Sequence, residues 1–183
     1  MSAHRFRLIF VLLLTVTGSA ESAPPSLEAG VGRIPSAGPS GELPNCAGVA
    51  LFNTGALKKS DYVDPAYELP GILQHCYVVN PSGPRRGDIG VISDKRGMPV
   101  HAWVEIGDKN LVISKDGTEP IPIAKRERSQ MIAFYRRDFS GRKITYHSPN
   151  SSAFKEGDCP IDIETFRKRA WEGSLTPRQF KKR

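Results

Sequence analysis

The sequence predicts an α+β domain in which a helix comes first and a largely antiparallel sheet follows. Residues 45–57 place apolar side chains at helical spacing after an asparagine. From residue 86 onward the pattern changes to short segments of alternating apolar and polar residues, which is typical of strands. Residues 107–110 read Gly-Asp-Lys-Asn, a tight-turn signal between two of these segments. A helix followed by consecutive short strands is the order of an α+β domain.

The first twenty residues have the pattern of a secretory signal peptide. Arg5 and Arg7 precede an apolar run from Leu8 to Val16, and small residues end the segment at 18–20. The run is shorter than the roughly 20 residues that a bilayer-spanning helix needs. We therefore expect residues 1–20 to be removed and the protein to be exported, either periplasmic or secreted.

Three further regions are expected after the signal peptide. Residues 21–41 are rich in Pro, Gly, Ser and Ala and predict a linker or an extended arm. The main folded domain is expected over residues 42–150. Residues 151–183 then form a C-terminal extension with a basic tail.

The positive charge of the chain is concentrated in that tail. The formal charge is +7, and residues 165–183 contain seven basic residues and one acidic residue. This distribution predicts weak adhesion of the tail to an anionic polymer or membrane surface. It argues against a specific nucleic-acid partner, because such a protein carries its positive charge across the working face.

The positions of the remaining helices and strands follow from hydrophobic periodicity and from capping and helix-breaking residues. Asn45 is a good N-cap for the first helix, and a weaker helix is expected over residues 65–76 with a break at Pro70-Gly71. Strands are expected over 88–93, 100–106, 111–115, 121–123, 131–137 and 142–146, and a last helix over 160–171.

Three cysteines limit the disulfide chemistry. They are Cys46, Cys76 and Cys159, and an odd number leaves at least one thiol free or paired between chains. If Cys46 is free, Cys76 and Cys159 are the remaining pair. The sequence leaves open whether these two form a disulfide or stay as buried thiols. No histidine lies at metal-ligand spacing from the cysteines, so we expect neither a metal site nor a cofactor.

Cys46 is a candidate nucleophile because it follows the N-cap. Unpaired N–H groups and the helix dipole favour a thiolate at the first turn. The same N–H groups can stabilise the oxyanion that forms when a thiolate attacks a carbonyl. The alternative is a small buried thiol with a packing role only.

His101 is the candidate base, and Asp116 is the candidate third residue. Alternation over residues 100–106 puts Ala102 and Val104 on the core face and His101 on the other. Counting outward from the turn places Asp116 opposite His101, where a carboxylate could orient the imidazole. Ser114, on the same face, is the alternative for this third role.

These residues resemble those of NlpC-type cell-wall peptidases. Residues 45–48 (Asn-Cys-Ala-Gly) resemble the Asp-Cys-Ser-Gly signature of that family, and residues 86–89 resemble its Pro-Gly-Asp-Leu strand entry. Val100-His101 and the turn at 106–108 resemble its His-Val-Gly strand. The resemblance covers about residues 38–124. It implies a papain-like fold and hydrolysis of amide bonds in peptidoglycan stem peptides through a thioester acyl-enzyme. By the same resemblance, Cys46 is the nucleophile, His101 is the base and peptidoglycan peptides are the partner.

The match departs from the family pattern in three places, and a second family competes with it. Asn45 and Ala47 replace an Asp and a Ser, and the family's third polar residue falls near Ile113 or Ser114. Residues 101–105, followed by Asp-Gly-Thr at 116–118, also resemble segments of transglutaminase-like proteins. The alternatives to a hydrolase are therefore a transglutaminase-like acyl transferase or other cysteine protease, and a non-catalytic secreted module on the same fold.

Overall fold

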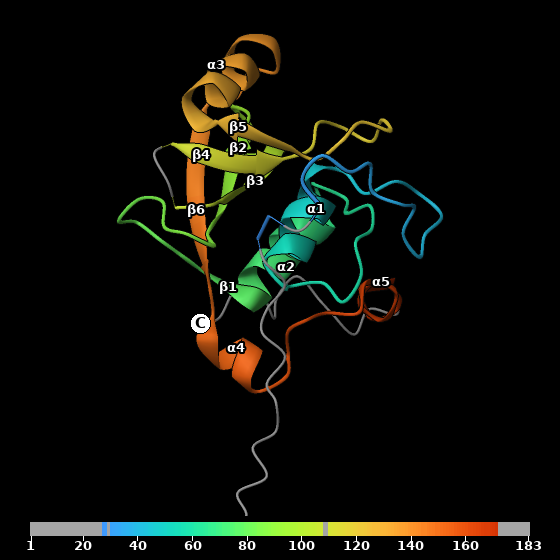
Figure 1. Cartoon of the computed structure of the whole chain (residues 1–183). Coiled ribbons are helices and arrows are strands. Elements are labelled where there is room, and N and C mark those ends of the chain that lie inside the picture. Colours follow the sequence, from blue (N-terminus) through green and yellow to red (C-terminus); the bar gives the residue numbers. More distant parts are fainter. Residues whose placement is uncertain (1–26, 29, 108–109, 172–183) are drawn as a thin grey trace, which may run out of the picture.

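The computed structural model describes residues 27–28, 30–107 and 110–171, and within them the chain is an α+β domain (Figure 1). The helices are α1 (Cys46–Asn53), α2 (Glu68–Cys76), α3 (Arg128–Asp138), α4 (Ser151–Lys155) and α5 (Ile163–Trp171). The strands are β1 (Tyr77–Val79), β2 (Ile89–Ser93), β3 (Pro99–Glu105), β4 (Leu111–Ser114), β5 (Ala124–Glu127) and β6 (Lys143–Pro149). They form one sheet in the order β1-β6-β2-β3-β4-β5, and every pair is antiparallel. The predicted α+β class with an antiparallel sheet is confirmed.

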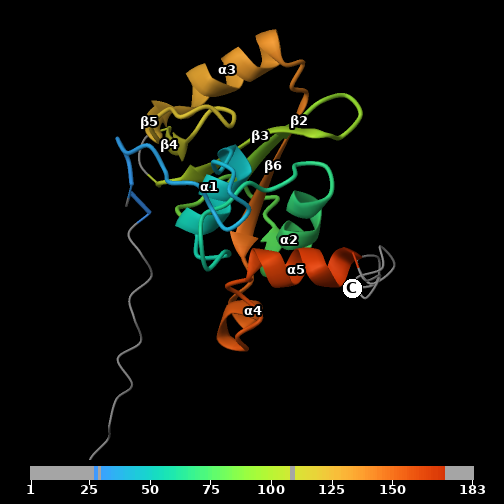
Figure 2. The same cartoon turned by 90° about the vertical axis from the view of Figure 1, so that its right-hand side faces the viewer.

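Two apolar clusters lie on opposite faces of the sheet. The larger contains α1, α2 and the side chains of Ala102 and Val104 from β3. The smaller is formed by Trp103 of β3 together with Met131 and Tyr135 of α3. Figures 1 and 2 show α1 and α2 together on one side of the sheet and α3 apart from them. Both faces of β3 are therefore covered by helices.

The predicted pairing of β3 with β4 is confirmed. Val104 lies opposite Ile113, and Glu105 lies opposite Val112, as counting from the turn predicts. The β4 strand ends at Ser114. Asp116 therefore lies beyond the paired part of the strand, and ladder geometry does not fix its side chain opposite His101.

The predicted strand over residues 131–137 is wrong, because this segment belongs to helix α3. Met131 and Tyr135 are both buried in the smaller cluster, and a spacing of four residues puts them on one helical face. A short apolar segment fits a helix and a strand about equally well by pattern alone. The deciding contact, with a strand some thirty residues earlier, is not visible in the local sequence.

The predicted break at Pro70-Gly71 is also wrong, since α2 runs from Glu68 through both residues. Pro70 is in the first turn of the helix, where the missing N–H would have had no partner within the helix. The strand expected over residues 121–123 is wrong as well. Among the described residues this segment makes a single bridge, between Ile123 and Val31, and strand β5 begins at Ala124.

The segment before residue 42 is an arm that contacts the domain. Gly32 N–H donates to the Ile123 carbonyl at 2.8 Å, and Ile123 N–H donates to the Arg33 carbonyl at 3.0 Å. The expected signal peptide at residues 1–20 and the end of the basic tail at 172–183 lie outside the described residues. Among the helices that are described, none is both long and apolar enough to cross a membrane.

The C-terminal extension is part of the folded domain as far as α5. A disulfide joins Cys76 at the end of α2 to Cys159, with a Cα–Cα distance of 6.1 Å. Leu57 and Ile161 form a bridge a few residues further on. The pairing that the sequence left open is thus a disulfide, and Cys46 is the free cysteine.

Candidate active site

Cys46 is the first residue of α1, and Asn45 caps that helix. The Gly48 N–H donates to Asn45 Oδ1 at 2.9 Å. The same side chain also binds the chain at Val63: its Nδ2 donates to the Val63 carbonyl at 2.8 Å, and Oδ1 accepts from the Val63 N–H at 3.3 Å. An aspartate could cap the helix but could not donate to this carbonyl. Asn45 therefore fixes the helix that begins at Cys46 to a neighbouring segment.

Gly48 lets that segment cross α1 at very short range. A Cβ atom built on Gly48 would lie 1.7 Å from the Asp61 carbonyl oxygen, so any side chain here would displace the segment. The glycine of the Asn-Cys-Ala-Gly sequence thus has a packing reason that is independent of any family.

The Cys46 thiol lies against the backbone of β3 beside His101. The N–H groups of Ala102, Ala47 and Cys46 itself act on the sulfur to lower its pKa. Burial outweighs them and raises the pKa of the thiol above its ordinary value, and the negative charge of Asp116 acts in the same direction. At neutral pH the described site therefore holds a neutral thiol with thiolate-stabilising groups already in place.

His101 is buried on the α3 face of the sheet. Its ring stacks on Tyr135, with centroids 4.0 Å apart and planes 14° from parallel. Burial lowers the pKa of His101 to about 3, although the negative charge of Asp116 opposes that shift. Within the part of the chain that the structure describes, neither ring nitrogen has a hydrogen-bond partner, so the expected hydrogen bond from the ring to the Asp116 carboxylate is absent and the ring makes none to Cys46.

Asp116 binds two other groups instead. The Tyr135 hydroxyl donates to Asp116 Oδ1 at 2.8 Å, and Arg126 Nη2 lies 2.6 Å from Oδ2. The residue that follows, Gly117, has φ +53°, which turns the chain after β4. Ser114, the alternative third residue, is buried on the α3 face, and its hydroxyl has no hydrogen-bond partner among the residues described.

Lys115 is a buried cation that sequence reasoning missed. The residue is fully buried, and its Nζ donates to the carbonyls of Gly117 at 3.0 Å and Glu119 at 2.7 Å. Burial lowers the pKa of Lys115, while the charges of Cys46 and Asp116 would raise it, so the three groups interact. The sequence did contain an indication of this burial. Lys115 is two residues after the core residue Ile113, and residues two apart in a strand point to the same face of the sheet.

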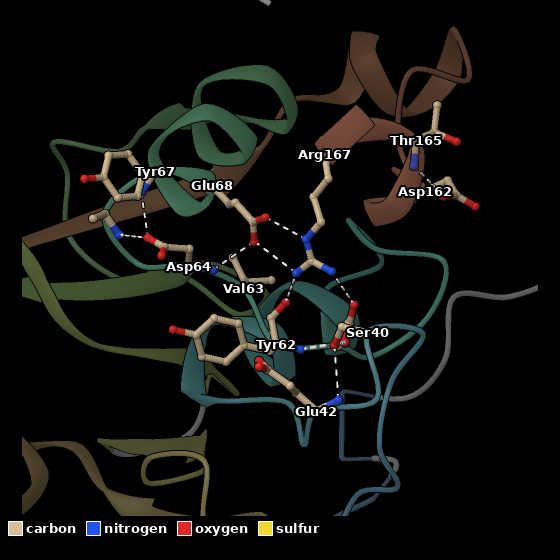
Figure 3. Close-up of polar contacts among 12 residues, drawn as sticks. Ser40, Glu42, Tyr62, Val63, Asp64, Tyr67, Glu68, Asp162, Thr165 and Arg167 are labelled. Carbon is tan, nitrogen blue, oxygen red and sulfur yellow. Dashed lines mark hydrogen bonds and ion pairs between the residues drawn. The ribbon is translucent and has the colours of Figure 1, made fainter. Parts of the chain in front are cut away.

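Arg167 of α5 supports the segment that holds Asn45 (Figure 3). Its guanidinium binds Asp61 at 2.8 Å, Glu68 at 2.7 Å and the Tyr62 carbonyl at 2.6 Å. The Asp61 side chain is completely buried and also accepts a hydrogen bond from Ser40. Arg167, which the sequence analysis places in the basic tail, is therefore part of the support of the site.

The site thus consists of three side chains. They are the free thiol of Cys46 at the start of α1, the imidazole of His101 on β3 under the Tyr135 ring, and the buried ammonium group of Lys115. Within the described residues, no group of three or more His, Cys, Asp or Glu side chains could hold a metal ion. No protein family, no curated protein and no solved structure matches the chain. The chemistry of the site and the motif resemblance are therefore what indicate a function for this protein.

Proposed function

We propose that this protein is an exported papain-like cysteine hydrolase that cleaves amide bonds in peptidoglycan stem peptides. One observation carries the proposal: the free thiol of Cys46 begins α1 and has the N–H groups of Ala102, Ala47 and Cys46 directed at its sulfur. Such N–H groups favour both a thiolate and the oxyanion of a tetrahedral intermediate.

The chemistry would run through a thioester. His101 takes the thiol proton, and the Cys46 sulfur attacks the amide carbon, whose oxygen becomes negatively charged. The C–N bond then breaks, and the amine leaves with the proton that His101 returns. Water next attacks the thioester carbon, giving up a proton to His101, and the carboxylic acid is released while the thiol regains its proton.

The substrate class rests on the motif resemblance and on the expected export. The disulfide between Cys76 and Cys159 supports an oxidising compartment, because such bonds are rare in the cytosol. The order of the cysteine, the Gly-Asp strand entry and the histidine along the chain supports a cell-wall peptidase over a transglutaminase-like transferase.

Purified peptidoglycan incubated with the protein tests this proposal. Mass analysis of the released fragments should detect new stem-peptide ends, and Cys46→Ala and His101→Asn should abolish them. Asp116→Asn, which retains much of the side-chain volume, should lower the rate less than His101→Asn, because Asp116 acts on the ring only through space. Fragment release that survives Cys46→Ala would disprove the proposed mechanism.

A second candidate, a non-catalytic secreted module on the same fold, is favoured by the state of His101. A stacked imidazole with a pKa of about 3 is a poor base at neutral pH. Fragment release distinguishes the two candidates directly. A protein that releases no fragments, and whose Cys46 stays unreactive when Tyr135 is replaced by alanine, would be a non-catalytic module.

A further inference from the structure

One corner of the molecule exposes large apolar side chains that the candidate site does not use. Phe134 of α3 is 39% exposed, Phe139 just after α3 is 50% exposed, and Met98 in the turn between β2 and β3 is 42% exposed. The rings of Phe134 and Phe139 lie 5.6 Å apart and pack against each other. The Arg142 N–H donates to the Ser93 carbonyl at 2.6 Å, which joins the turn to the segment after α3. Figure 2 shows this turn near the end of α3.

Exposed cations lie on the same segments of the chain as these apolar side chains. Five exposed cations lie on the turn and on the segment from α3 to β6: Lys95, Arg96, Arg136, Arg142 and Lys143. Among the described residues, none of the five forms an ion pair. We call these five cations and the three apolar side chains the basic-apolar corner.

The acidic residues nearby do not cancel this charge. Asp138 is paired with Arg137 at 2.8 Å. The carboxylate of Asp94 accepts from the backbone N–H groups of Arg96 at 2.8 Å and Met98 at 2.9 Å, so it shapes the turn. With Asp94 counted, the corner keeps a clear positive excess.

We propose that the basic-apolar corner is a docking surface for an anionic lipid bilayer. Apolar rings gain free energy by leaving water for the boundary of the acyl chains, and lysine and arginine side chains around them gain by lying near lipid phosphates. Both kinds of side chain are exposed on the same turn and on the same segment from α3 to β6, as such a surface needs. This surface is separate from the basic tail, and it needs no activity of Cys46.

A bilayer fits the corner better than a nucleic acid or another soluble polyanion. The rings of Phe134 and Phe139 are tilted by 57° and touch each other, so they do not offer two parallel platforms for stacked bases. A soluble polyanion would satisfy the cations but would leave the phenylalanines in water. Only a partner with both charge and an apolar interior uses the whole corner.

Vesicles test the proposal in the full chain. Phe134→Trp places a fluorescent reporter in the corner, and Tyr67→Trp, at a side chain that is 85% exposed elsewhere, is the matched control. Vesicles with about one third phosphatidylglycerol should shift the emission of Phe134→Trp to shorter wavelength, and brominated lipids should quench it. Neither effect should occur with Tyr67→Trp. Quenching of both reporters, or of neither, would overturn the proposal.

Two sets of substitutions separate the apolar from the electrostatic contribution to vesicle binding, which is measured by co-sedimentation with the same vesicles. Phe134→Ser with Phe139→Ser should lower the partition coefficient about tenfold. Arg136→Gln with Arg142→Gln and Lys143→Gln should do the same and should reduce the salt dependence. If removal of residues 172–183 abolishes binding while the phenylalanine pair has no effect, the tail binds the bilayer and the proposal is wrong. Equal loss of binding to heparin and to vesicles in the phenylalanine pair would identify a polyanion site instead.

Discussion

Tyr135 covers the imidazole of His101, with ring centroids 4.0 Å apart, and its hydroxyl donates to Asp116 at 2.8 Å. Tyr135 thus shields the imidazole of His101, the candidate base, from water. It also binds the Asp116 carboxylate, which was expected to orient that imidazole. In this arrangement the imidazole of His101 is covered and the Asp116 carboxylate is bound elsewhere, so the proposed chemistry would need Tyr135 to uncover the ring.

Tyr135→Ala should raise the reactivity of Cys46. Water that reaches His101 would bring its pKa up from about 3 toward the ordinary value, so the imidazole could accept the thiol proton. We expect the rate of alkylation of Cys46 by iodoacetamide at pH 7 to rise about tenfold, which corresponds to one unit of effective pKa. Mass spectrometry of the labelled Cys46 peptide measures this rate.

Tyr135→Phe is the control for that prediction, because it keeps the stacked ring and removes only the hydroxyl. Its alkylation rate should stay close to that of the unaltered protein. A rate as high as that of Tyr135→Ala would mean that the hydrogen bond to Asp116, and not the cover over the ring, restrains the site.

The stability of the fold should fall in acid because of His101. Its pKa is about 3 in the folded state and ordinary in the unfolded state, so below about pH 6.5 the unfolded chain binds a proton that the folded chain does not. The stabilisation is complete above that pH and is lost as the pH falls toward 3, by about 1.4 kcal/mol per pH unit. Urea unfolding at pH 4.5, 5.5 and 6.5 should show this slope to be smaller in His101→Gln. Parallel curves for the two proteins would mean that the ring is hydrated in solution.

Lys115 should lower the cost of forming the thiolate. Replacement by methionine keeps most of the side-chain length and removes the positive charge that interacts with Cys46. The pKa of the Cys46 thiol should rise further, and alkylation should need a higher pH. A pH profile of iodoacetamide labelling measures the shift, and Lys125→Met on the partly exposed strand β5 is the control. An unchanged profile in Lys115→Met would limit this lysine to binding the Gly117 and Glu119 carbonyls.

The parts of the fold that could be predicted are those whose pattern is local. The Gly-Asp-Lys-Asn turn signal in the sequence predicted the register of Val104 with Ile113, and Asn45 marked the start of α1. The rest depends on distant contacts. Nothing near residue 135 indicates that its ring lies on His101, and a basic segment does not reveal that Arg167 binds the buried Asp61. Asp116 was misplaced because pleat geometry holds only while the strands are paired.

Arg167 should stabilise the whole domain. Asp61 is completely buried, so Arg167→Ala would leave a carboxylate without its charged partner and would also remove the contacts with Glu68 and the Tyr62 carbonyl. Breaking such a pair from one side costs about 3 kcal/mol, and urea unfolding should show that loss. Arg169→Ala, at an exposed position of the same helix, should change the free energy of unfolding by less than about 0.5 kcal/mol. A deletion that tests the basic tail must therefore begin after Trp171, because removing residues 165–183 would take Arg167 with it. Equal stability of the two alanine variants would mean that Ser40 and the Tyr62 N–H are sufficient partners for Asp61.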